Sequence, residues 1–212
     1  MGVGELETQM IVKLQGGLGN QMFQYAYGRS RGAKFDRTNC GEGRSYALDP
    51  FNLPIELDSP ADTFGYWQSE KFFDHDVARE QFLLPPQLRQ ASLENTVAVH
   101  IRMADNFSDR ALAFHGNLLD TDYYGRAIRY MKQQLKDPKF VLYSDGSRLQ
   151  PAAPHHDIWS MARCPYIIIA NSSFSWWGAW LGPQKIVIAP KRWFVVDVPG
   201  AEDIVPDRWI KM

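Results

Sequence analysis

The sequence predicts an α/β fold in which a parallel sheet carries helices on both faces. Strand-like and helix-like patterns alternate through the second half of the chain, from residue 96 to residue 190. Segments 166–169 and 185–190 are apolar at almost every position, which is typical of strands covered on both faces. Segment 121–135 gathers its apolar residues on one helical face. Such alternation calls for right-handed crossovers and a parallel sheet.

Composition narrows the functional classes. With 212 residues, 45% of them hydrophobic, the chain can bury one sizeable core or two small ones. A formal charge of -1 gives no overall attraction to nucleic acid or to an anionic membrane. Cys40 and Cys164 lack the spacing of a disulfide framework or a zinc site, so both are expected to be structural. No membrane span or leader peptide is visible, so we expect a cytoplasmic protein whose membrane contact is peripheral at most.

The first βα pattern contains closely spaced glycines. A strand is predicted at 9–14 and a helix at 20–31, with Gly17 and Gly19 between them. Glycines at such a turn let the backbone approach a ligand closely. The dinucleotide-binding fingerprint is not met, because Met22 stands where its third glycine would be. From the pattern alone, a ligand-binding loop and an empty tight turn are both open.

Residues 32–95 are less regular. Five prolines interrupt them, so only a strand at 63–67 and a short helix at 74–82 are predicted. Asp74 and Asp76 have the spacing of a carboxylate pair that holds a metal ion against a sugar nucleotide. We expect them to cap the helix instead, since they do not follow a buried strand. No metal site is predicted.

Three polar side chains lie at or just after the carboxyl end of the strand predicted at 96–101. They are His100, Arg102 and Asp105. Further along, Asp145 follows the strand predicted at 139–143, where an Asx turn is the simplest explanation for it. An ordinary strand edge with a surface ion pair also explains the first group. Short polar segments of this kind therefore do not identify a site one at a time.

The stretch from residue 166 to residue 181 is the strongest local signal. A buried strand runs through Asn171, Ser172 and Ser173 into an apolar helix at 174–181. The start of such a helix presents free backbone N–H groups and the positive end of a dipole, so an anion would bind there. A capped core helix without a ligand is the alternative.

Parallel strands bring these segments together. Their carboxyl ends share one edge of the sheet, and ligands of such sheets bind beyond that edge. Arg102, Asp145 and Ser172 all fall there. We therefore predict that the three motifs converge on one site.

Six segments resemble motifs of one enzyme family, the α-1,2-fucosyltransferases of glycosyltransferase family 11. The longest is NSSFSWWGAWL at 171–181, with its paired tryptophans. The others are GGLGNQMFQYA at 16–26, GYWQSEKFF at 65–73, HIRMAD at 100–105, FVLYSDG at 140–146 and APKRWF at 189–194. The resemblance covers most of the chain in order.

This resemblance implies a two-domain GT-B-like fold with two Rossmann-like halves. Residues 1–95 would form a shortened acceptor-side half, and residues 96–212 a half that binds the GDP-sugar. The implied reaction is an inverting transfer of L-fucose from GDP-fucose to the 2-hydroxyl of a galactoside. No metal and no other cofactor is expected.

The resemblance also implies roles for particular residues. Arg102 would stabilise the negative charge that grows on the departing pyrophosphate, with His100 and Asp105 supporting it. Asp145 would accept hydrogen bonds from the guanine ring. The general base stays open between Glu70, His115 and Asp105. The residues expected to contact GDP-fucose are Gly17, Gly19, Asn20, Gln21, Asp145, Asn171, Ser172, Ser173 and Phe174.

Two departures from the family motifs bear on activity. Met103 stands in place of the second arginine of the His-x-Arg-Arg-x-Asp motif, and Gly146 in place of the second aspartate of Phe-Ser-Asp-Asp. The chain is also short for the family, with sequence missing between Arg31 and Thr63 and again between Asp145 and Asp157. Two alternatives follow: a non-catalytic protein that binds GDP or a GDP-sugar, and an interaction domain whose exposed tryptophans bind glycans or protein.

Overall fold

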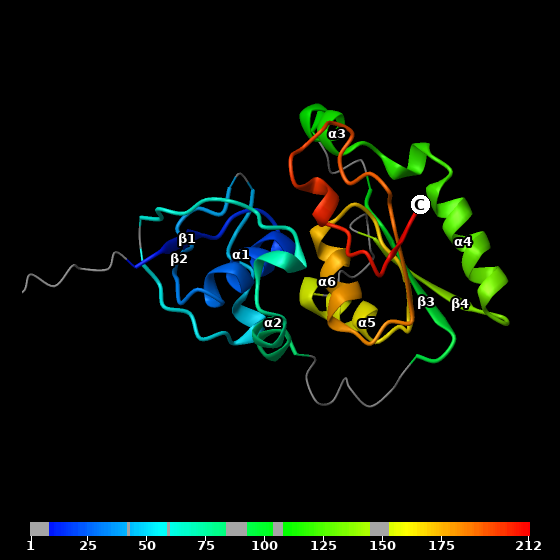
Figure 1. Ribbon diagram of the computed structural model, residues 1–212, viewed down its shortest axis with the longest axis horizontal. Helices are drawn as coiled ribbons and strands as arrows, with labels where there is room; N and C mark the ends of the chain where they lie inside the picture. The colour runs from blue at the N-terminus through cyan, green and yellow to red at the C-terminus, as the bar shows by residue number, and fades with distance from the viewer. Residues whose placement is uncertain (1–8, 42, 59, 84–92, 104–107, 145–152) are drawn as a thin grey trace, which may run out of the picture. The chain divides into compact units, whose positions relative to one another are not determined.

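The computed structural model describes residues 9–41, 43–58, 60–83, 93–103, 108–144 and 153–212. The chain forms two compact units, residues 1–81 and residues 82–212 (Figure 1). Each unit has its own parallel sheet, so each is described by itself. No helix in the described part of the chain is long and apolar enough to cross a bilayer.

The first unit is a small β–α–β arrangement. Strands β1 (Ile11–Lys13) and β2 (Lys34–Asp36) pair in parallel, and helix α1 (Leu18–Arg29) connects them. The sequence predicted β1 and α1 but not β2. The strand predicted at 63–67 is reduced to a bridge at Thr63, whose carbonyl oxygen accepts a hydrogen bond from the Lys13 amide at 2.9 Å. The short helices described in this unit are η1 (Asp49–Phe51), η2 (Glu70–Phe72) and α2 (His75–Gln81).

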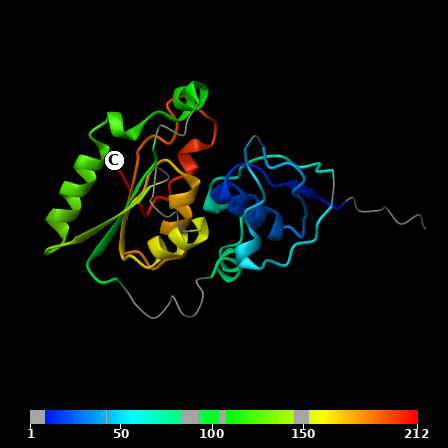
Figure 2. The ribbon, with the colours of Figure 1, turned by 180° about the vertical axis from the view of Figure 1, so that it is seen from behind.

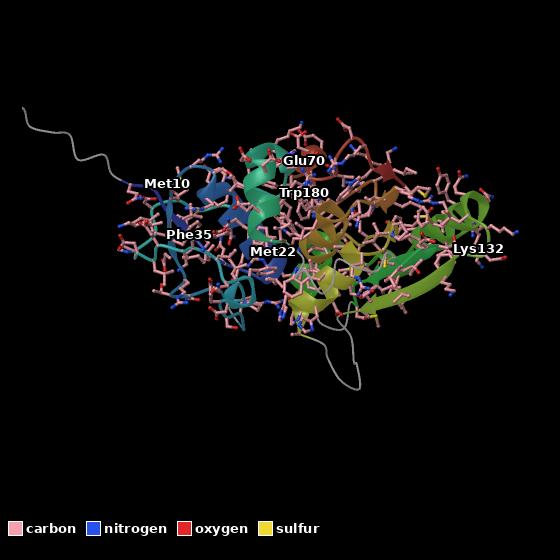
Figure 3. The ribbon with its side chains drawn as sticks, turned by 90° about the horizontal axis from the view of Figure 1, so that it is seen from below. Met10, Met22, Phe35, Glu70, Lys132 and Trp180 are labelled. Carbon is pink, nitrogen blue, oxygen red and sulfur yellow. The ribbon has the colours of Figure 1, made fainter. Side chains whose placement is uncertain are left out.

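Helix α1 packs closely on the two strands. Its buried Met22 and the buried Phe35 of β2 belong to the core of this unit (Figure 3). The rings of Tyr25 and Phe35 stack with their centroids 5.1 Å apart. A Cβ atom at Gly28 would lie 2.7 Å from the Phe35 ring, so only glycine permits this approach of helix to strand.

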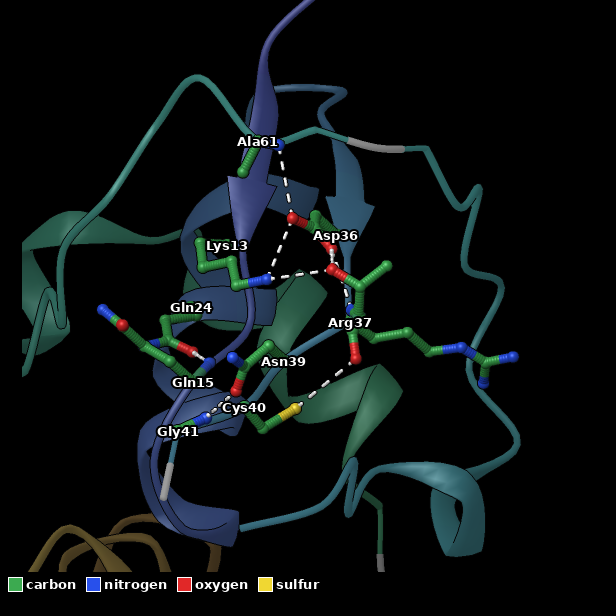
Figure 4. A network of polar contacts seen from close by, with 10 residues as sticks. Lys13, Gln15, Gln24, Asp36, Arg37, Asn39, Cys40, Gly41 and Ala61 are labelled. Atoms are coloured by element: carbon green, nitrogen blue, oxygen red, sulfur yellow. Dashed lines mark hydrogen bonds and ion pairs between the residues drawn. The ribbon is translucent and has the colours of Figure 1, made fainter. Parts of the chain in front are cut away.

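A buried ion pair joins the two strands (Figure 4). The Lys13 ammonium lies 2.9 Å from the Asp36 carboxylate, and their side chains are only 12% and 6% exposed. Burial alone would raise the pKa of Asp36, but hydrogen bonds from Thr38, Lys13 and Ala61 outweigh it and hold that pKa well below its usual range. The carboxylate is therefore a charged anchor between β1, β2 and the segment at Ala61.

We expect Asp36→Asn to destabilise the first unit by about 3 kcal/mol, because it leaves the Lys13 ammonium buried without a counter-charge. The measurement is amide hydrogen exchange of the β1–β2 pairing in the full chain. Asp58→Asn is the matched control, since it removes an exposed pair with Lys34 at 3.4 Å and should cost at most about 0.5 kcal/mol. Equal exchange rates in the two variants would contradict the stabilising role of the buried Lys13–Asp36 pair.

The second unit contains a five-stranded parallel sheet in the order β4-β3-β5-β6-β7. This confirms the α/β class and the parallel sheet predicted from the sequence. Its strands are β3 (Thr96–Ile101), β4 (Lys139–Ser144), β5 (Tyr166–Ile168), β6 (Ile186–Ala189) and β7 (Ile210–Lys211). Its described helices are α3 (Asp109–His115), η5 (Leu118–Asp120), α4 (Tyr123–Gln134), α5 (Pro154–Ala162), α6 (Ser173–Leu181) and η6 (Ala201–Asp203).

Helices cover both faces of this sheet (Figures 1 and 2). Helix α4 lies on one face, where Val99 and Ile168 meet Met131 in a buried cluster. Helices α5 and α6 pack together on the other face. The sequence did not predict α3 or β7, although it did predict that the segment around Trp209 returns to the sheet, where Trp209 is buried.

The tryptophans of this unit belong to its core. Six of the seven in the chain are buried: Trp159, Trp176, Trp177, Trp180, Trp193 and Trp209. The indole N–H of Trp176 donates to the Ile204 carbonyl oxygen at 2.7 Å, so its one polar atom is hydrogen-bonded within the core. The alternative function that needed exposed tryptophans is therefore wrong for these six residues.

Candidate functional site

The carboxyl edge of the second sheet brings together two of the three predicted motifs, those that contain Arg102 and Asn171. Strands β3 and β5 are neighbours, but the chain forms β4 on the far side of β3 before it returns to β5. The strand order therefore reverses between β3 and β5, and such a reversal opens a crevice at the carboxyl ends of the strands. Arg102 follows β3 and Asn171 follows β5. The Arg102 guanidinium donates to the Asn171 carbonyl oxygen at 3.1 Å, which places Arg102 at this crevice.

Asn171 organises the edge. Its side chain is buried, and its amide nitrogen donates to the His115 carbonyl oxygen at 2.8 Å and to the Trp193 carbonyl oxygen at 3.1 Å. These two acceptors lie at the end of α3 and in the loop after β6. One side chain thus ties both segments to the end of β5.

The start of α6 is not capped by a side chain. The N-cap residue is Ser172, one of the three cap residues predicted, and its hydroxyl makes no capping hydrogen bond. Asn171, the strongest predicted cap by residue type, is turned toward His115 and Trp193 instead. Ser172, Ser173 and Phe174 are only partly buried, so the first N–H groups of the helix and its dipole are available to an anion.

His100 and Phe174 come together as well. His100 is 3% exposed, and its ring centroid lies 5.6 Å from that of Phe174 in the first turn of α6. Its carbonyl oxygen accepts a hydrogen bond from the Tyr124 hydroxyl at 3.0 Å. His100 therefore contacts both Phe174 and Tyr124 and is almost fully buried. These contacts are typical of a residue that supports a site without touching the ligand.

His115 adds a titratable group. Burial, and second the nearby Arg102 guanidinium, lower the pKa of His115 to about 4. The imidazole is therefore neutral at pH 7 and keeps a proton-accepting nitrogen. It lines a hollow of about 540 Å³ together with Phe114 and Val196. The sequence raised His115 as a candidate base but contained no signal for α3, the helix that positions it.

This chain matches one known protein family over most of its length. The model described as Glycosyl transferase family 11 matches residues 59–212. The chain is a member of glycosyl transferase family 11. The match spans the whole edge just described, so Arg102, Asn171 and the start of α6 lie within the family's shared region.

Curated relatives extend the comparison. An alpha-1,2-colitosyltransferase of Escherichia coli is 27% identical over 286 aligned positions, which cover 96% of this chain and 98% of the relative. Those positions outnumber the 212 residues here, so that relative has segments that this family 11 member lacks. This agrees with the predicted shortness of the chain. No solved structure gives a significant match.

Two further relatives match over shorter regions. The O-antigen biosynthesis glycosyltransferase WbnK of Escherichia coli is 33% identical over 138 residues, covering 56% of this chain and 45% of the relative. Galactoside alpha-(1,2)-fucosyltransferase 1 of Bos taurus is 26% identical over 161 residues, covering 59% of this chain and 45% of the relative. These matches span less than half the length of either relative.

The glycine turn of this family 11 member lies in the first unit. Gly16 has φ +78°, in the left-handed region that favours glycine, and Gly17 is the N-cap of α1. Gly19 is buried in the first turn of that helix. The predicted turn between strand and helix is therefore present. Donor contact by Gly17 and Gly19 stays a prediction.

The two polar residues predicted beside this turn have structural contacts. Asn20 accepts a hydrogen bond from the Gln68 side chain at 2.7 Å. Gln21 is fully buried, and its amide binds the backbone of Gly16, Ser45 and Ala47, each at 2.9 Å. Gln21 thus holds the loop that follows β2 against the glycine turn. A direct role of either residue in donor binding stays a prediction.

Other predicted residues are placed differently. Asp105 and Asp145 lie outside the described residues. Glu70 is in η2 of the first unit, where its carbonyl oxygen is 3.0 Å from a ring nitrogen of His75. Asp74 caps α2 as predicted, since its carboxylate accepts hydrogen bonds from the Asp76 and Val77 amides at 2.9 and 3.0 Å. Within the described part of the chain, no group of three or more His, Cys, Asp or Glu residues is arranged to hold a metal ion.

His115 also predicts a pH dependence of stability. Its pKa is about 4 in the folded state and about 6.5 unfolded, so the unfolded state binds more protons between these values. The free energy of unfolding should therefore fall by about 2 to 3 kcal/mol as the pH drops from about 6.5 to about 4. Above pH 6.5, His115 should cause no further change. Urea unfolding followed by tryptophan fluorescence measures this loss of stability, because six of the seven tryptophans lie in the second unit, which contains His115.

His115→Gln should remove most of that pH dependence, because the protonation that opposes folding is gone. His156→Gln, an exposed histidine of α5, is the control and should behave as wild type. If the free energy of unfolding of His115→Gln falls with acid as steeply as that of wild type, other groups cause the loss of stability.

Proposed function

We propose that this protein is an inverting, metal-independent transferase that moves L-fucose from GDP-fucose to the 2-hydroxyl of a galactoside. One observation carries the proposal: the edge of the second sheet joins a guanidinium and an uncapped helix N-terminus at the reversal of strand order. Both features stabilise anions. A departing pyrophosphate needs that kind of stabilisation.

The relatives support a deoxyhexose as the transferred sugar. The names of two of them specify α-1,2 transfer, one of colitose and one of fucose. We choose fucose because the sequence motifs resemble the fucosyltransferases. Colitose is the direct competitor, since the colitosyltransferase match covers almost the whole chain. The two-domain GT-B arrangement is part of the proposal, supported by the two units that each contain parallel strands joined through helices.

The proposed reaction is a single displacement. The acceptor hydroxyl oxygen bonds to the anomeric carbon of the sugar while the bond from that carbon to the pyrophosphate oxygen breaks. GDP leaves with the electron pair, and the hydroxyl proton passes to a base. Arg102 and the first amides of α6 receive the charge on GDP. We take His115 as the base, because among the candidates within the described residues its imidazole lies near Arg102, and its lowered pKa keeps it unprotonated.

Met103 favours a second candidate function. It is partly exposed beside Arg102, and its thioether cannot donate a hydrogen bond to phosphate. A protein that binds GDP or a GDP-sugar without transfer is therefore the alternative. Restoring the motif with Met103→Arg should raise the transfer rate if the missing donor limits it, by about 10²-fold for one well-placed donor.

The first test is a calorimetric titration of GDP into the full chain in EDTA. We expect binding without metal, and a loss of roughly 10- to 100-fold in affinity for Arg102→Ala, because a charged hydrogen bond to phosphate is removed. Lys139→Ala, which removes a cation at the amino end of β4, is the control and should bind as wild type. Binding that requires a divalent metal would overturn metal independence, and no GDP binding by a folded protein would overturn the transferase assignment.

The second test compares donors. Incubation with the GDP-linked form of each sugar and a galactoside should yield an α-1,2-linked product faster with fucose than with colitose. The ratio of kcat/KM values decides between them, because specificity is a ratio of these constants. Retained GDP binding with no transfer from either donor would favour the non-catalytic alternative.

A further inference from the structure

A groove lies on the face of the second sheet that carries α4. It has a volume of about 770 Å³ and lies between α4 and the chain that leaves the carboxyl end of β6. Figures 1 and 2 show α4 on this face, with the end of the chain beside it. A volume of this size is typical of small-molecule sites. None of the residues assigned above to the donor site lines it.

Helix α4 presents one polar stripe to the groove. Arg126, Arg129, Tyr130 and Gln133 are spaced i, i+3, i+4 and i+7, so they lie on one side of the helix, and all four line the groove. The opposite apolar side of α4 packs on the sheet through Ala127 and Met131. The two arginines of the stripe thus lie away from this apolar side, while Tyr130 also packs partly against the core.

Two more cations line the groove from across the sheet edge. Lys191 and Arg192 follow β6, and both are exposed. The Lys191 amide donates to the Met212 carbonyl oxygen at 2.6 Å, which fixes this segment beside the end of β7. Two elements therefore direct four cationic side chains at one hollow.

The acidic residues nearby only partly balance this charge. Arg126 pairs with Asp122 at 3.3 Å and Arg192 with Asp197 at 3.6 Å, but these side chains are all about half or more exposed, so the pairs are weak. In the ranges that the structure describes, no carboxylate lies within ion-pair distance of Arg129 or Lys191. The groove has a net positive charge that an anion would neutralise.

Part of the groove lining is apolar. Leu118, Pro190 and Met212 line it together with Tyr123, whose hydroxyl donates to the buried carbonyl oxygens of Ile169 and Ile188. An apolar lining beside cationic side chains suits a ligand that has a phosphate at one end and a less polar body. Arginine is the side chain that best matches phosphate geometry, and two arginines lie one turn apart here.

We propose that this groove is a second anion site, which binds a phosphate-bearing ligand through Arg126, Arg129, Lys191 and Arg192. The phosphate comes either from a free organic phosphate or from a lipid headgroup. The site is independent of GDP binding at Arg102. The proposal therefore stands or falls separately from the proposed transfer reaction.

The test removes the two arginines of the stripe. The double variant Arg126→Gln/Arg129→Gln is compared with the control Lys132→Gln/Lys136→Gln. The control removes the same charge from Lys132 of α4 (Figure 3), which lies over the Phe140 ring of β4, and from Lys136 just after the helix. Neither lysine lines the groove. Inorganic pyrophosphate is titrated into each by calorimetry in an Arg102→Ala background, so that the donor site does not contribute. Each protein is also sedimented with phosphatidylcholine vesicles, with and without phosphatidylglycerol.

We expect the arginine variant to bind at least one probe roughly 10- to 30-fold more weakly than the lysine control, since each cation near a phosphate surface contributes about tenfold or less. A loss of pyrophosphate binding identifies a free phosphate, and a loss of vesicle binding alone identifies a lipid headgroup. Equal binding by the two variants, or no binding of either probe by the parent protein, overturns the site. GDP titrations of both variants without Arg102→Ala should match wild type.

Discussion

The buried amide of Asn171 is the interaction on which the carboxyl edge of the second sheet depends. A buried amide must be hydrogen-bonded, and here its two donors satisfy carbonyl oxygens of two different segments. The carbonyl oxygen of the same residue accepts from Arg102. Three segments that are far apart in sequence, at 102, 115 and 193, are thereby held at the end of β5.

This arrangement explains why α6 starts without a side-chain cap. The Asn171 side chain is hydrogen-bonded to His115 and Trp193, and Ser172 makes no capping hydrogen bond. No side chain therefore caps the first amides of the helix at the crevice. An uncapped N-terminus costs stability in an empty protein and becomes useful when an anion binds. The same logic applies to the cations around the α4 groove, whose mutual repulsion a phosphate would relieve.

Buried polar groups also hold the first unit together, but they serve structure there. The amide of Gln21 forms hydrogen bonds with backbone groups, and the carboxylate of Asp36 accepts hydrogen bonds from a neighbouring side chain and from backbone. They position the glycine turn and the loop after β2. Motif residues can therefore belong to a site by supporting it, which a sequence pattern does not distinguish from direct contact with a ligand.

The sequence by itself determined the α/β class, the order of the main strands and helices, and the family. Those follow from local causes: apolar runs, helical periodicity and a long motif with paired tryptophans. Only the tertiary structure decided that these tryptophans form core, that Asn171 bonds two loops, and that α3 brings His115 to Arg102. Helix α3 and strand β7 are short and lack a strong period, and contacts between distant segments depend on sheet order, which no local pattern encodes.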